Sequence, residues 1–175
     1  MNLSEVKPKN RKKLIAIDFD DTLVKTDSKV KIHTHDGRTI VVTPSSWARY
    51  EPHPKDKTDF SEFDKIINPR PIKWTMNILK RSKLSGSKRK TVILTARAVW
   101  KPIKDYLRKM LGVDVYVVNL GSGSPQAKAD YIEKHIKKGY NEVEFFDDVS
   151  KNIRAVDQLK NQYPSVLIRT HLIKK

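Results

Sequence analysis

The sequence contains no cysteine, which excludes disulfide bonds and metal sites built from thiolates. No apolar run approaches the roughly 18 residues that a membrane-spanning helix needs. The first residues lack the apolar block of a signal peptide. A GxxxxGK[ST] phosphate-binding loop is also missing, so kinase chemistry of that type would have to come from another chain. We therefore expect a cytoplasmic protein with no membrane partner.

Acidic residues are few relative to basic ones. Lys and Arg together number 36 against 20 Asp and Glu, which gives a formal net charge of +16 and a sequence pI near 9.9. The excess is concentrated in residues 7–13, in residues 80–90 and on one helical pattern with Lys101, Lys104, Arg108 and Lys109. This distribution favours a polyanionic partner such as DNA or RNA, with a merely solvated basic face as the alternative.

A length of 175 residues fits one domain, and its main part alternates strand and helix patterns. We predict strands at residues 14–18, 91–95, 113–118, 142–146 and 166–169. We also predict four helices. The first opens at Pro71, the second runs from Val99 to a stop at Gly112, and the third runs from Pro125 to Gly139 with Ser124 as its cap. The fourth carries the apolar stripe Ile153, Val156, Leu159 and Tyr163. Such alternation predicts an α/β fold, a three-layer Rossmann-like parallel sheet.

Residues 24–69 interrupt this alternation and read as an insertion after the first strand. Two β-rich runs flank Asp36-Gly37, a strong signal for a β-hairpin. The rest is polar and contains scattered aromatic residues. His33 and His35 share a face of this hairpin, but without a third ligand they do not indicate zinc. We therefore divide the chain into a basic arm, residues 1–13, and one domain, residues 14–175, that carries the insertion as a small cap.

Polar residues follow the predicted strands at the edge where ligands bind in such sheets. Strand 14–18 leads into three carboxylates, strand 91–95 ends in a hydroxyl and strand 142–146 leads into two more carboxylates. These residues are Asp18, Asp20, Asp21, Thr95, Asp147 and Asp148, with Arg97 following Thr95. So many carboxylates at one edge would repel one another unless a divalent cation neutralised them, and hard oxygen ligands favour Mg²⁺. Lys128 lies early in the helix predicted from Pro125 and could bring a positive charge to the same edge.

This combination is what phosphoryl transfer through an aspartate requires. One carboxylate attacks phosphorus, a second protonates the leaving alkoxide, and a cation and a lysine neutralise phosphate charge. Asp18 and Asp20 are spaced two apart, so both can face one pocket.

The segments DFDDT, LTAR, QAKADYI and FFDDVSKN resemble, in order, the four motifs of the haloacid dehalogenase superfamily of Mg²⁺-dependent phosphatases. The resemblance spans residues 14–169. It implies that Asp18 is the nucleophile, Asp20 the acid/base, Thr95 the phosphate-binding hydroxyl and Lys128 the stabilising lysine. It implies metal ligation by Asp18, Asp20 (through its backbone carbonyl), Asp148 and Asp147. We expect Thr22 to contact the substrate, and Arg97 either to grip the substrate phosphate or to lie on the solvent face of a helix.

The sequence departs from the superfamily pattern at two places. Asp21 stands where many relatives have Gly. The last motif reads Asp147-Asp148 with Asn152 four residues on, where many relatives have Gly-Asp and a second Asp. One good metal ligand remains, so we expect activity, with the ligation by Asp147 placed in doubt.

NPRPIKWTMNIL, LTAR and GSGSPQAKADYIEKHI are also similar to the 3′-phosphatase module of phage-type polynucleotide kinases. This similarity implies that the substrate is a nucleic-acid 3′-phosphate end, in a host-cell cytoplasm if the origin is a phage. Trp47 and Tyr50 would then lie where a terminal base stacks. Alternatives are a nucleotidase or small-ester phosphatase, and a catalytically inert nucleic-acid-binding protein. A receiver domain is disfavoured because the third predicted strand leads into Asn119 rather than Asp.

Overall fold

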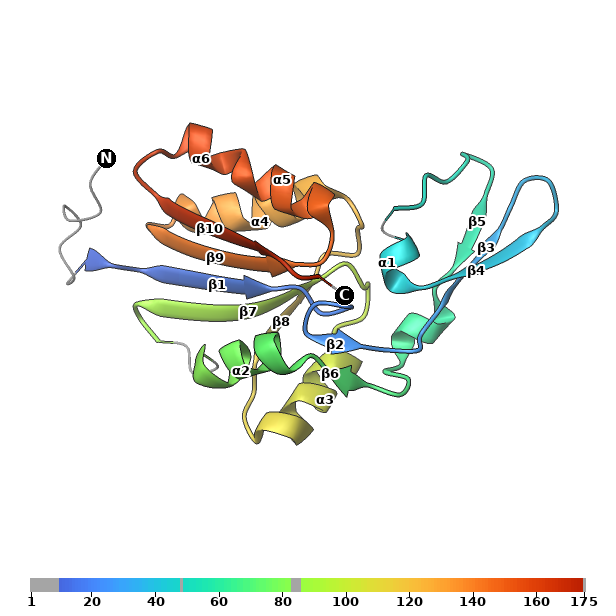
Figure 1. The fold of residues 1–175 in the computed structure, drawn as a ribbon, viewed down its shortest axis with the longest axis horizontal. Coiled ribbons are helices and arrows are strands. Elements are labelled where there is room, and N and C mark those ends of the chain that lie inside the picture. Colours follow the sequence, from blue (N-terminus) through green and yellow to red (C-terminus); the bar gives the residue numbers. More distant parts are fainter. Residues whose placement is uncertain (1–9, 48, 83–85, 175) are drawn as a thin grey trace.

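The larger part of the molecule is a five-stranded parallel sheet with the order β10-β9-β1-β7-β8 (Figure 1). The computed structural model describes residues 10–47, 49–82 and 86–174. The strands are β1 (Lys13–Ile17), β7 (Arg89–Thr95), β8 (Tyr116–Asn119), β9 (Glu142–Asp147) and β10 (Leu167–Leu172). β1 lies at the centre and pairs in parallel with β7 and with β9. The predicted α/β class with a parallel sheet is confirmed, and the arrangement is compatible with a Rossmann-like layout.

Helices cover both faces of this sheet. They are α2 (Lys73–Ser82), α3 (Lys101–Leu111), α4 (Pro125–Ile136), α5 (Ser150–Asp157) and α6 (Leu159–Gln162). The apolar residues of α2 and α3 share one buried cluster, and those of α4, α5 and α6 share another on the opposite face. Within the described part of the chain, no helix has the length and hydropathy that a bilayer span requires.

β1 is buried on both faces, which explains its continuous run of apolar residues. Leu14 and Ala16 pack toward α4 and α5, whereas Ile15 and Ile17 pack toward α2 and α3. All four are at most 5% exposed, and burying a large aliphatic side chain contributes about 1.5–3 kcal/mol. The strand is thus anchored up to the residue before Asp18.

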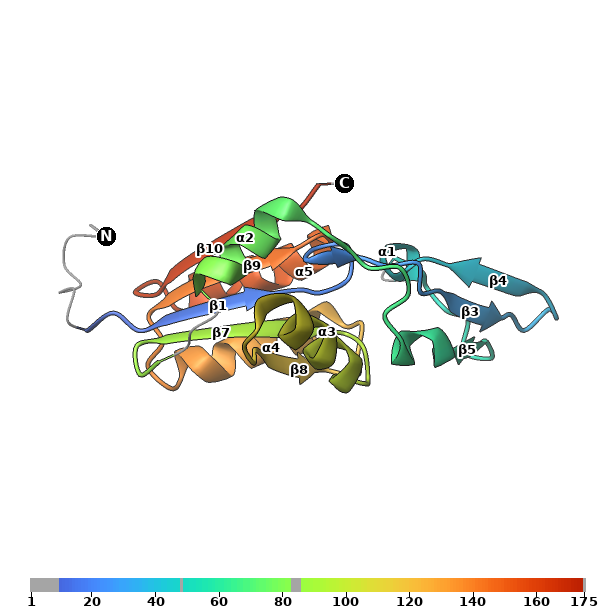
Figure 2. The ribbon, with the colours of Figure 1, turned by 90° about the horizontal axis from the view of Figure 1, so that it is seen from below.

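The insertion forms a second, antiparallel sheet with the order β4-β3-β5 that extends beyond the carboxyl ends of the parallel strands (Figure 2). Its elements are β3 (Val30–His33), β4 (Thr39–Val42), α1 (Pro44–Trp47), β5 (Lys57–Asp59) and the 3₁₀ helix η3 (Ser61–Asp64). The predicted hairpin is confirmed, and Gly37 in its turn has a φ of +87°. Two short antiparallel strands, β2 (Val24–Lys25) and β6 (Arg70–Pro71), bracket the insertion. Its limits are therefore 26–69 rather than 24–69.

Several predicted boundaries were wrong. Pro71 does not open a helix but lies in β6 opposite Val24, because the fixed φ of proline suits a short edge strand as well as a first helical turn. Val99 lies before the start of α3, and the strand predicted at 113–118 is the shorter β8. α4 ends before Gly139. The apolar stripe predicted on one helix at 153–163 is divided between α5 and α6. Gly112 does end α3, with a φ of +70°.

The basic arm is shorter than predicted. Residues 1–9 lie outside the described part, but Lys13 begins β1. The backbone N–H of Lys12 donates to Asn141 Oδ1 at 2.9 Å, and Lys12 Nζ donates to the carbonyl of Lys138 at 3.2 Å. Lys12 and Lys13 therefore belong to the body of the domain.

Candidate active site

The candidate catalytic residues lie at the carboxyl ends of the three central strands. Asp18 follows β1, Thr95 ends β7 and Asp147 ends β9. The chain first winds from β1 through β7 to β8 and then crosses to β9 on the other side of β1. The carboxyl end of β1 is therefore the point where the winding reverses, and open α/β sheets bind ligands at that point.

Lys128 connects two of the carboxylates. It lies in the first turn of α4 and is only 4% exposed. Its Nζ donates to Asp18 Oδ1 and to Asp147 Oδ2, both at 2.6 Å. Burial alone would lower the pKa of Lys128, but the charges of Asp147 and Asp18 outweigh burial and raise that pKa. A buried ammonium group is thus fixed between the ends of β1 and β9.

Asp147 is held by donors on every side. Besides Lys128, the backbone N–H of Val149 donates to Oδ1 at 2.8 Å, and Asn152 Nδ2 lies 3.0 Å from each carboxylate oxygen. Asp147 is fully buried. It therefore ties β9 to the start of α5, and a metal ion would have to compete with these donors for its oxygens.

Asp18, Asp147 and Asp148 each offer a carboxylate oxygen within 4.8 Å of the others. Burial raises the pKa of Asp18 well above its usual value; Lys128 opposes this shift, and the charges of Asp147 and Asp148 add to it. Thr22 Oγ1 donates to Asp148 Oδ1 at 3.4 Å. A cluster of hard oxygens with more negative than positive charge fits Mg²⁺. Asp18 and Asp148 are the side chains best placed to hold it.

Asp20 belongs to a different network. Arg97 grips its carboxylate with both sides of the guanidinium, Nε to Oδ2 at 2.8 Å and Nη2 to Oδ1 at 2.7 Å. Nη1 donates to the carbonyls of Phe63 and Lys65 in the insertion, and Nη2 also donates to Thr26 Oγ1. All N–H donors of this guanidinium, which is stacked over the Phe63 ring at 4.5 Å, therefore have protein acceptors. Sequence reasoning missed this link.

Arg97 is 2% exposed, so it does not lie on a solvent-exposed helical face.

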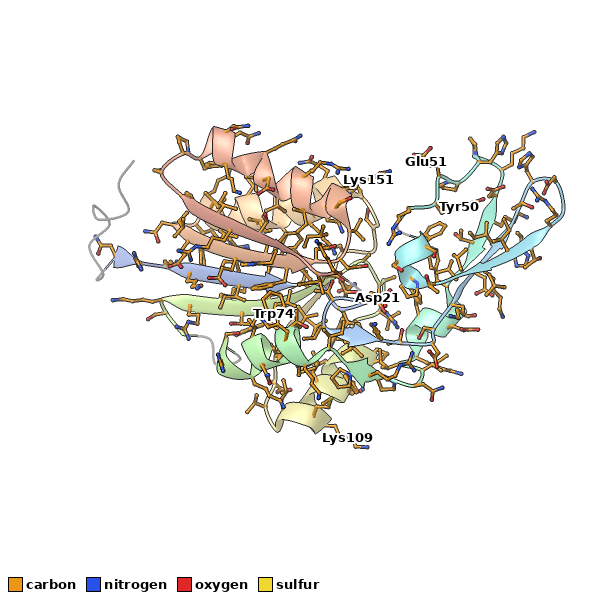
Figure 3. The ribbon with its side chains drawn as sticks, viewed as in Figure 1. Asp21, Tyr50, Glu51, Trp74, Lys109 and Lys151 are labelled. Atoms are coloured by element: carbon orange, nitrogen blue, oxygen red, sulfur yellow. The ribbon has the colours of Figure 1, made fainter. Side chains whose placement is uncertain are left out.

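A second link between the insertion and the sheet domain lies at the surface. Lys151 Nζ of α5 is 3.7 Å from Glu51 Oε1, and Figure 3 shows the two side chains on facing elements. Both are well exposed, and such pairs contribute only about 0–1 kcal/mol. Arg97 is therefore the main polar link.

A small pocket of about 50 Å³ opens between the strand ends and the insertion. It is lined by six of the residues expected from the sequence: Asp18, Asp20, Arg97, Lys128, Asp147 and Asp148. The insertion contributes Trp47 and Phe63 to the walls. A cavity needs about 10–15 Å³ of such space to hold one water, so this pocket has room for a small group such as a phosphoryl group.

Thr95 and Thr22 do not belong to the residues that line this pocket. Thr95 is fully buried, and its Oγ1 accepts the backbone N–H of Arg97 at 3.2 Å, which shapes the turn after β7. Thr22 is also fully buried, beside Asp148. The contacts of both residues fit a positioning function, and substrate contact by either stays a prediction.

Asp21 has a left-handed backbone, with a φ of +60°. Glycine adopts this conformation without steric cost, and Asp is among the few other residues that tolerate it. This explains the glycine that the resemblance leads one to expect here. Asp21 lines a separate groove with Lys25 and Arg70 rather than the pocket with Asp18.

The insertion contains a group of possible metal ligands, His35, His53 and Asp56. His33, the partner considered from the sequence, instead contacts Thr39 Oγ1. Asp56 accepts from the N–H of His35 and of His53, and the hydroxyl of Tyr50 donates to it at 2.9 Å. Through these hydrogen bonds Asp56 stabilises the conformation of its loop. They also place Tyr50 away from the pocket, so of the two aromatics predicted to stack on a base only Trp47 lines it.

Comparison with known proteins gave no match: no family model, curated protein or solved structure is similar enough to the chain to indicate its family. A function for the chain is therefore inferred from the residues of the pocket and from their geometry.

Proposed function

We propose that this chain is a Mg²⁺-dependent phosphatase of the haloacid dehalogenase type that removes phosphate from nucleic-acid 3′ ends. The observation that carries the proposal is the buried Lys128 between Asp18 and Asp147, with Asp148 alongside, in a pocket of phosphoryl size. Titratable groups whose pKa values are shifted by burial and by charged partners, and which lie together in a pocket, are candidates for a catalytic site.

Asp18 is the nucleophile in this proposal. Lys128 holds Oδ1, which fixes the carboxylate for attack of an oxygen on phosphorus. The bond from phosphorus to the ester oxygen breaks as the aspartyl-phosphate forms, and water then hydrolyses that intermediate. A bound Mg²⁺, held by Asp18 and Asp148, would supply the positive charge that keeps Asp18 ionised and shields the phosphate oxygens.

Asp20 gives a proton to the leaving alkoxide and later takes one from the attacking water. It lines the pocket, but both of its oxygens are engaged by Arg97. One of these hydrogen bonds has to loosen for each proton transfer. The insertion, acting as a cap, therefore holds the acid/base through Arg97.

Two conservative substitutions test the catalytic assignment. Asp18→Asn removes the nucleophile and should abolish Mg²⁺-dependent release of phosphate from a 3′-phosphorylated oligonucleotide. Asp21→Asn is the matched control, because it makes the same chemical change three residues away, outside the pocket, and Asn also tolerates a positive φ. Equal activity of the two variants would rule out Asp18 as the nucleophile.

The substrate class is tested separately by comparing a 3′-phosphorylated oligonucleotide, its 5′-phosphorylated twin and a mononucleotide at two salt concentrations. We expect the 3′-phosphorylated end to react fastest. Its kcat/KM should fall as the salt concentration rises, because a chain with a formal charge of +16 attracts the oligonucleotide electrostatically. The second candidate, a nucleotidase, is favoured by the small size of the pocket. It predicts that the mononucleotide reacts best and that salt has little effect.

A further inference from the structure

A second cavity adjoins the catalytic pocket and has no part in the chemistry described above. It measures about 200 Å³. The two cavities share Trp47, Phe63, Ala96, Arg97 and Gly123 as wall residues. A ligand whose phosphate occupies the first cavity would therefore place its neighbouring group in the second.

One wall of this cavity is aromatic and comes from the insertion. Trp47 and Phe60 meet edge to face with ring centroids 5.2 Å apart, and Phe60 contacts Phe63 at 5.8 Å. Trp47 is only partly buried and Phe60 is 39% exposed, although both are large apolar side chains in a small subdomain. Aromatic surface left open beside a catalytic pocket is suited to stacking against a flat ring.

The other wall is the loop between β8 and α4, where Gly121, Ser122 and Gly123 line the cavity. A Cβ built on either glycine would meet nothing within 4 Å, so side chains at these positions would project into open space. We call this cavity, which is lined by aromatic side chains of the insertion and by a loop with two glycines and one small side chain, the slot. Arg97 adds no unused N–H donor to this slot, and Asp64 is the acidic residue on its lining.

We infer that this slot binds the nucleobase of the 3′-terminal nucleotide, stacked on Trp47. The inference rests on the proposed function and names the part of the substrate that the site recognises besides phosphate. A cavity of about 200 Å³ is smaller than the roughly 300–1,000 Å³ of sites for drug-sized ligands. It therefore holds one ring system, and the rest of the strand remains outside.

The first experiment compares two 3′-phosphorylated oligonucleotides that differ only in whether the last nucleotide carries a base or is abasic. Base–aromatic stacking contributes about 1–3 kcal/mol, so the wild type should prefer the base-bearing end by roughly 5- to 150-fold in kcat/KM. Trp47→Leu should bring the ratio of the kcat/KM values for the two ends close to one. Trp47→Phe should restore part of the preference.

Trp74→Leu is the control variant. Trp74 is 54% exposed and lies on α2, away from the insertion (Figure 3). It should keep the wild-type preference. If Trp47→Leu lowers both substrates equally, or if an aryl phosphate is a better substrate than either oligonucleotide, the nucleobase assignment is wrong.

A binding measurement separates this inference from the proposed catalysis. Tryptophan fluorescence of the Asp18→Asn protein is titrated with a nucleoside 3′-monophosphate and with ribose phosphate. Quenching by the nucleotide alone, lost in Trp47→Phe and kept in Trp74→Leu, supports the slot even if no phosphatase activity is found. Equal quenching by both ligands, or no quenching, overturns the inference whatever the activity.

Discussion

Replacing Arg97 with Met should weaken the connection between the insertion and the sheet domain. The side chain is 2% exposed and pairs with Asp20 at 2.7 and 2.8 Å. It also donates at 2.9 Å to the carbonyls of Phe63 and of Lys65. Met fills a similar length but removes the charge and every donor. Asp20 then remains as a poorly compensated carboxylate, and two carbonyls of the insertion lose their partner.

The expected loss in the free energy of unfolding is about 3–5 kcal/mol, the range for removing one partner of a buried ion pair. Lys151→Met is the matched control, because Lys151 also joins the sheet domain to the insertion. Its partner, Glu51, lies 3.7 Å away, and the two side chains are 50% and 90% exposed. The control should lose at most about 1 kcal/mol.

Urea unfolding followed by circular dichroism measures both losses. Amide hydrogen exchange then locates the change. Relative to the wild type, Arg97→Met should increase the exchange rates of the β3 amides more than those of the β1 amides. Adding Asp20→Asn to Arg97→Met should cost less than the sum of the single substitutions, since the uncompensated charge is gone. Additive effects within about 0.5 kcal/mol, or equal losses in Arg97→Met and Lys151→Met, would refute this account.

Three further predictions concern other parts of the molecule. Lys128→Met should lower the free energy of unfolding by about 3–5 kcal/mol in urea titrations, whereas Lys137→Met, in an exposed pair, should change it by less than about 1 kcal/mol. Burial and the charge of Lys90 lower the pKa of His135 against the opposing effect of a backbone hydrogen bond. The unfolded chain therefore takes up the proton first as pH falls below about 6.5, and stability should decline in that window less steeply in His135→Gln than in the wild type. Lys88 and Arg89 line a basic groove at the opposite end of the sheet. The double substitution Lys88→Glu and Arg89→Glu should weaken salt-dependent oligonucleotide binding without altering the turnover of a small phosphate ester. Unchanged binding would show that the groove does not bind the oligonucleotide.

The sheet and the position of the site were predictable because both depend on local patterns. Continuous apolar runs alternate with helical stripes, which determines a parallel sheet, and polar residues directly after such strands must lie at one edge. Asp18 and Asp147 follow from this rule alone. Lys128 was predictable as a candidate because it lies in the first turn of α4, although its two contacts depend on the packing of that helix against β1 and β9.

The contacts of the carboxylates were not predictable, because their partners are distant in sequence and carry no pattern. Phe63 and Lys65 bind Arg97 through backbone carbonyls, which no side-chain motif reports. These contacts divide a pair of carboxylates only two residues apart. Asp18 is held from within the sheet domain by Lys128, whereas Asp20 is held through Arg97 to the insertion. A change in how the insertion packs would therefore move Asp20, the proposed acid/base, and leave Asp18, the proposed nucleophile, in place.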